Sequence, residues 1–106
     1  MYKLSILCIS TLFFGICSAL GDFASAVVFV RNSKPIRMSD DKKLKVYALY
    51  KQATIGDCPK SGSGEFDPYR RATLNAWYAV KGMNKLDAEN QYVKIIDEFV
   101  PGWRNL

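Results

Sequence analysis

Residues 47–57 read YALYKQATIGD, and they are the most informative part of the chain. Tyr47, Tyr50 and Lys51 are spaced three and four residues apart, which places their side chains on one face of a helix. Gly56 follows, and a glycine is common just past the C-terminus of a helix. The stretch therefore predicts the last turns of a helix that carries two phenols and an ammonium side by side.

The helix that contains this stretch is predicted to run from an N-cap at Ser39 to about Ile55. A serine oxygen can accept a hydrogen bond from the first turn, and the two aspartates that follow suit the positive end of the helix dipole. Upstream, apolar residues at i, i+3, i+4 and i+7, beginning at Phe23 and ending at Val30, predict a first helix. That helix should stop by Pro35.

Two more helices are predicted downstream. Asp67-Pro68 is an N-cap followed by proline at the first helical position, so a third helix should run from there to Val80. Asn84 opens a fourth helix in capping-box style, and Pro101-Gly102 closes it. Residues 56–67 lack the GK[ST] of a phosphate-binding loop and are interpreted as a flexible connector. The sum is an all-α bundle of four helices.

An uncharged apolar run occupies residues 4–20, directly after Lys3. Its ending, Cys17-Ser18-Ala19, has the small side chains that a signal peptidase accepts, so residues 1–19 are predicted to be a signal peptide. The alternative is an uncleaved membrane anchor, because the run is near the lower length limit for crossing a bilayer. Residues 20–106 would then be the folded domain. We expect it in the secretory pathway or at a membrane, with the cytoplasm as the alternative.

The composition argues against catalysis. The chain has no histidine, which excludes Ser-His and Cys-His mechanisms and any histidine-ligated metal. Cys58 is the one cysteine outside the leader, so the domain can form neither an internal disulfide nor a zinc site. No pair of carboxylates suggests acid–base chemistry. The sequence therefore favours a binding protein that is not an enzyme and needs no metal or other cofactor.

The formal net charge of +5 favours anionic partners such as phosphates, nucleotides, nucleic acid or acidic membranes. Arg31, at the end of the first helix, and Arg70, in the third, are candidates to add charge to the face of Tyr47 and Lys51. The alternative interpretation is a basic helical module that binds nucleic acid or a membrane surface. Against nucleic acid, the basic residues are dispersed and no single helix face gathers them.

Residues 47–57 also resemble the signature Y-x-x-Y-K-Q-A-T-x-G-D of the acyl-CoA-binding protein family. A second block is similar in content and spacing: Ala76-Trp77, Lys81-Gly82, Asp87-Ala88 and Tyr92. The resemblance covers about residues 22–103. It implies a four-helix acyl-CoA-binding domain that carries and buffers long-chain fatty acyl-CoA esters without catalysis, and we expect a monomer that does not bind nucleic acid.

The resemblance also implies roles for single residues. Tyr47 and Lys51 match the tyrosine and lysine at the 3′-phosphate of CoA, and Tyr50 matches a tyrosine near the adenine. Tyr92 matches the fourth-helix tyrosine that contacts the nucleotide. Arg31 falls where the family has a basic residue on the first helix.

Two positions depart from the family pattern. Thr73 stands where a third-helix lysine is usual, and Arg70, one turn earlier, is the candidate to replace it. Lys43 stands at an apolar position that lines the acyl chain in the family.

Membrane association, if present, would use residues 1–20.

Overall fold

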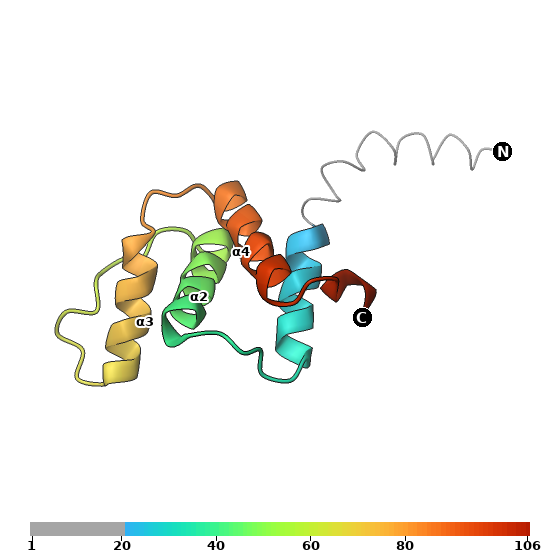
Figure 1. Cartoon of the computed structure of the whole chain (residues 1–106). Helices are drawn as coiled ribbons and strands as arrows, with labels where there is room; N and C mark the ends of the chain where they lie inside the picture. Colours follow the sequence, from blue (N-terminus) through green and yellow to red (C-terminus); the bar gives the residue numbers. More distant parts are fainter. Residues whose placement is uncertain (1–20) are drawn as a thin grey trace, which may run out of the picture.

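The computed structural model of the chain describes residues 21–106 (Figure 1). Within that range the chain contains no strand and forms four helices and a short 3-10 helix. They are a first helix over residues 21–32, α2 (Asp40–Thr54), α3 (Pro68–Ala79), α4 (Lys85–Phe99) and η1 (Trp103–Asn105). The all-α, four-helix prediction is confirmed. The predicted leader, residues 1–19, and the residue at which the domain would begin lie outside the described residues.

The helix starts follow the capping residues expected from the sequence. The Ser39 side chain accepts a hydrogen bond from the backbone N–H of Lys42, and Asp67 accepts one from Tyr69. The Oδ1 of Asn84 accepts one at 2.8 Å from the N–H of Asp87. Each bond satisfies a backbone donor that the helix itself leaves unpaired.

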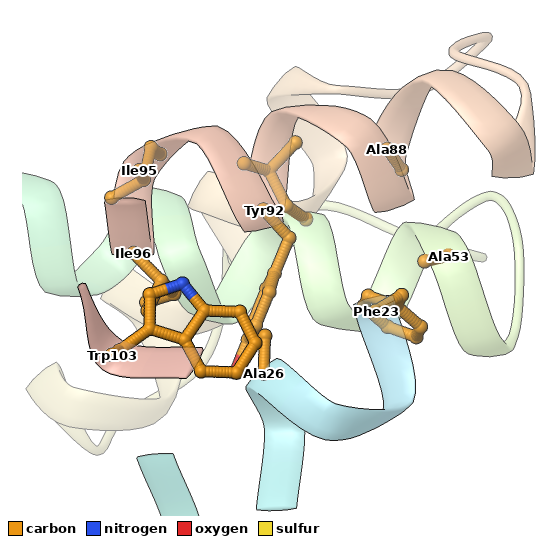
Figure 2. Close-up of a cluster of buried hydrophobic side chains, with 9 residues drawn as sticks. Phe23, Ala26, Ala53, Ala88, Tyr92, Ile95, Ile96 and Trp103 are labelled. Carbon is orange, nitrogen blue, oxygen red and sulfur yellow. The ribbon is translucent and has the colours of Figure 1, made fainter. Parts of the chain in front are cut away.

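Helix α2 lies between α3 and α4 and packs against both, while the first helix lies beside α4 (Figure 1). Figure 2 shows side chains from the first helix, α2, α4 and η1 gathered in one cluster. The buried members of this cluster are Phe23, Ala26, Leu49, Ala53, Ala88, Tyr92, Ile95, Ile96 and Trp103. A second, smaller cluster between α2 and α3 contains Ala48, Cys58, Trp77 and Val80.

Hydrogen bonds from residues 52–57 join the end of α2 to the loop before α4. The buried Gln52 donates from Nε2 to Asp57 Oδ1 and to the backbone carbonyl of Met83, both at 2.8 Å. The N–H of Gly82 donates to the same Asp57 oxygen at 2.9 Å. That bond, the Gln52 amide and the charge of Lys81 hold the pKa of Asp57 below its ordinary value of 3.8.

The C-terminal segment returns onto the first helix. Trp103 is buried, and its ring lies 5.6 Å from that of Phe29. Its Nε1 donates to Asp97 Oδ1 at 2.7 Å, and Arg104 donates to the same oxygen at 2.7 Å. Arg104 also approaches Asp22 at 3.6 Å. These contacts join η1, α4 and the first helix.

The loop over residues 56–67 differs from the expected flexible connector, because hydrogen bonds join it to α3. The N–H of Gly62 donates to Asn75 Oδ1 at 2.8 Å, and the Arg71 guanidinium donates to the carbonyl of Glu65. A Cβ at Gly62 would collide with the backbone carbonyl of Arg71, so only glycine allows this approach. Cys58, near the start of the loop, is buried, and its Sγ donates a hydrogen bond to the carbonyl oxygen of Lys60 at 3.0 Å.

Candidate functional site

An open groove of about 380 Å³ lies among the end of the first helix, the segment that follows it, α2 and α4. Its walls are mainly apolar, with three tyrosines and two lysines among them. The lining residues are Val30, Lys34, Pro35, Ile36, Met38, Lys43, Val46, Tyr47, Tyr50, Tyr92 and Ile96. Mainly apolar concave sites with a few converging polar groups are typical of small-molecule binding.

Three of the predicted site residues, Tyr47, Tyr50 and Tyr92, line this groove. The first two come from one face of α2, as their spacing predicts, and the third comes from α4. Tyr92 is only 3% exposed, and its ring packs edge-on against Phe23 at 5.2 Å. The helices therefore hold the three phenols in fixed positions around one hollow.

The ionisation of Tyr92 reflects this environment. Burial, and to a lesser extent the neighbouring Tyr50, raise the pKa of Tyr92 to about 12, while the charge of Arg31 acts in the opposite direction. The Tyr92 hydroxyl is therefore protonated at neutral pH and can donate a hydrogen bond. Arg31 itself follows the groove residue Val30 directly in the sequence and is exposed.

Lys51 lies in the last turn of α2, where its ammonium is held between two aromatic rings. Its Nζ is 5.8 Å from the centre of the Tyr47 ring and 5.4 Å from that of Trp77. Such cation–π contacts orient a lysine without neutralising its charge. Lys51 therefore presents a positive charge beside Tyr47 at the border of the groove.

Arg70 is not brought to the groove. Its side chain is 65% exposed, and its Nε lies 3.4 Å from Glu65 Oε1 in the loop before α3. Thr73, where the family lysine is missing, is buried and donates its hydroxyl proton to the carbonyl of Arg70 at 3.1 Å. The structure thus brings together Tyr47, Tyr50, Tyr92 and Lys51 and leaves Arg70 apart, while Arg31 follows the lining residue Val30.

The sequence analysis missed part of the groove wall. Ile36 and Met38 belong to the segment between the first helix and α2, which has no helical periodicity to reveal a buried face. The usable signal was two apolar residues in an otherwise polar connection. Lys43 does line the groove, in agreement with the departure noted from the family pattern.

Two other properties concern the described residues alone. No helix within residues 21–106 combines the length and the apolar character needed to cross a membrane. In the same range, no group of three or more histidine, cysteine, aspartate or glutamate side chains is placed to hold a metal ion.

Comparison with known proteins identifies the family. Residues 21–96 match the family model described as Acyl CoA binding protein. The chain belongs to this family. It is 41% identical over 69 residues to the acyl-CoA-binding protein of Saccharomyces cerevisiae, a match that covers 65% of this chain and 79% of the yeast protein.

Solved structures agree with this assignment. The solution structure of the acyl CoA binding protein from Babesia bovis superposes with a TM-score of 0.68 at 41% identity, over 80% of this chain and 97% of that one. The crystal structure of Oryza sativa Acyl-CoA-Binding Protein 2 superposes with a TM-score of 0.69 at 29% identity, over 77% and 90%. The resemblance seen in residues 47–57 is confirmed, as is the acyl-CoA-binding function that it implies. The comparisons give no support to a nucleic-acid-binding module.

Proposed function

We propose that the groove holds the ligand and that the protein carries and buffers long-chain acyl-CoA esters for lipid metabolism and transport. The observation that carries this proposal is the composition of the groove, an apolar hollow lined by three tyrosines, with the ammonium of Lys51 beside the lining residue Tyr47. Acyl-CoA has the matching parts, namely an apolar chain, an aromatic base and several phosphates. The chain buries apolar surface while the phosphates meet the cations.

Five of the predicted residues are assigned roles in the groove or beside it. Lys51 and Tyr47 are adjacent and are assigned to the 3′-phosphate, and Tyr50 offers its ring to the adenine. The protonated Tyr92 hydroxyl is assigned as a donor to the nucleotide, and Arg31, which follows the lining residue Val30, as a further cation. A charged donor to phosphate gives hydrogen bonds roughly twice as strong as neutral ones.

Arg70, the sixth predicted residue, contacts Glu65 and does not line the groove. To reach a phosphate it would have to leave Glu65, and an exposed ion pair of this kind is worth only about 0.2–1 kcal/mol. Exchange of one anion for another is therefore energetically accessible.

The acyl chain supplies the affinity that distinguishes the ester from free CoA. Each methylene removed from water contributes about 0.8 kcal/mol, so two fewer buried methylenes should weaken binding roughly fifteenfold. The groove lining contains tyrosines and lysines but no carboxylate or cysteine, which supports binding without turnover.

The decisive measurement is calorimetric titration with palmitoyl-CoA, free CoA and a DNA duplex. We expect one palmitoyl-CoA per chain, much weaker binding of CoA, and no binding of the duplex. Equal affinity for palmitoyl-CoA and CoA would show that the apolar groove does not take the chain.

We also propose that residues 1–19 direct the domain into the secretory pathway or hold it at a membrane, and that the domain acts as a monomer. The uncharged run after Lys3 supports the first part. N-terminal sequencing of the protein from expressing cells tests it. A chain that begins at or near Leu20 would show cleavage, an intact Met1 in the membrane fraction would show an anchor, and intact chain in the cytosol would contradict both.

A further inference from the structure

The groove carries two lysines that the nucleotide assignment does not use. Lys34 follows the first helix, and Lys43 lies near the start of α2, and both line the groove and are exposed to solvent. Among residues 21–106, no carboxylate forms a salt bridge with either ammonium; the ion pairs in that range involve Arg70 and Arg104. The groove therefore holds positive charge that the described chain does not neutralise.

The position of Lys43 separates it from the nucleotide end. Lys43, Tyr47 and Lys51 are spaced by four residues, so they follow one another along the same face of α2. Eight residues of helix span about 12 Å. The wall between the two ammoniums includes Val46 and Tyr47, and Ile36 and Met38 add apolar surface to the same groove. The groove is thus apolar along its length, with a cation near each end of this helix face.

A ligand that fits this lining has an apolar chain and carries an anionic group in addition to the CoA phosphates. Under the proposed function, on which this inference rests, the CoA phosphates take the Lys51 end. The apolar lining that Lys43 shares with Ile36, Met38 and Val46 is then left for the acyl chain. A terminal methyl gains nothing from an ammonium, whereas a carboxylate that leaves bulk water requires a charged partner.

We propose that Lys43 makes the groove selective for acyl-CoA esters whose chain ends in a carboxylate, that is, ω-carboxyacyl-CoA. Lys34, which also lines the groove, provides a second positive charge for the same group. The competing explanation is that Lys43 only covers apolar surface with its aliphatic stem while its ammonium stays in water. In that case its charge would be irrelevant to ligand choice.

The test uses the full chain and two ligands of equal carbon number, palmitoyl-CoA and hexadecanedioyl-CoA, the latter with a free terminal carboxylate. Both are titrated into the wild type, Lys43→Met and the control Lys45→Met. Lys45 is an exposed lysine of the same helix that does not line the groove. Because both variants remove one positive charge from α2, they differ mainly in contact with the ligand.

We expect Lys43→Met to weaken hexadecanedioyl-CoA binding about fivefold, near the upper range for an exposed ion pair. The same variant should strengthen palmitoyl-CoA binding, because methionine extends the apolar wall. Lys45→Met should change both affinities by a similar small factor. At high salt the preference of the wild type for the carboxylate should shrink, since exposed charges are screened.

Opposite shifts for the two ligands cannot arise from a general loss of folding. If Lys43→Met alters both affinities by the same factor, or matches Lys45→Met, the selectivity is absent and the inference is wrong while the proposed function stands. If the wild type fails to bind palmitoyl-CoA, the proposed function is wrong and this inference falls with it.

Discussion

Gln52 provides a sharp test of which family-motif residues bind ligand and which hold the fold. It follows Lys51 directly, yet it is 1% exposed, does not line the groove and points its amide at the loop before α4. Gln52→Leu keeps the volume nearly constant and removes both hydrogen bonds made by Nε2. We expect this change to lower the stability of the protein without lowering its affinity for acyl-CoA.

The magnitude follows from the groups left behind. Loss of the bonds to Asp57 and to the Met83 carbonyl costs about 1 kcal/mol each, and the desolvated carbonyl adds roughly 1 kcal/mol more. Leucine also removes the buried Oε1 of Gln52, which has no hydrogen-bond partner within the described residues, and this returns about 1 kcal/mol. The free energy of unfolding should therefore fall by about 2 kcal/mol.

Urea denaturation measures the loss of stability, and calorimetry with palmitoyl-CoA measures binding under conditions where the variant is folded. Gln91→Leu is the matched control, because Gln91 is exposed on α4 and makes no side-chain hydrogen bond in the described structure. The reasoning is refuted if Gln52→Leu is as stable as Gln91→Leu. It is equally refuted if the variant keeps its stability but loses affinity, because Gln52 would then act on the ligand.

Three further predictions concern single side chains. Lys51→Ala should weaken palmitoyl-CoA binding by about 1.5–3 kcal/mol in calorimetry, with an unchanged urea midpoint, and normal binding would remove Lys51 from the site. Because the pKa of Asp57 is lowered, its stabilising effect is complete above its ordinary value near 3.8 and is lost as the pH falls through the lower folded-state value. Asp57→Asn should therefore reduce the decline of Tm in acid, and an identical decline in both proteins would contradict this. Arg70→Ala should lower acyl-CoA affinity if Arg70 exchanges Glu65 for a phosphate, whereas unchanged affinity would show that the family contact missing at Thr73 has no replacement.

The helices were predictable because their limits are encoded locally. Ser39, Asp67 and Asn84 each cap the helix that follows, and a cap depends only on residues within one turn. The return of Trp103 onto Phe29 was not predictable, since it follows a Pro-Gly break and depends on contacts between residues far apart in the sequence.

The site was predictable to the extent that its residues share a helix. Tyr47 and Tyr50 follow from spacing on α2, but the meeting of that face with Tyr92 depends on how α2 packs against α4, and only the family resemblance anticipated it. Arg70 shows the limit of spacing arguments. A long exposed side chain has many rotamers of similar energy, so the nearest anion, here Glu65, decides where it lies.

The contacts of Trp103 and Arg104 bear on whether the order of the helices along the chain can be changed. Arg104 contacts Asp22, and the C-terminal segment lies beside the first helix (Figure 1). A peptide that joins residue 106 to residue 21 would close residues 21–106 into a ring and remove roughly 4.6 kcal/mol of conformational entropy from the unfolded chain. Opening that ring at Phe66, whose side chain is 95% exposed, would give a circular permutant that begins with α3 and in which the first helix follows η1. The order of the helices along the polypeptide would change while every buried contact stayed the same.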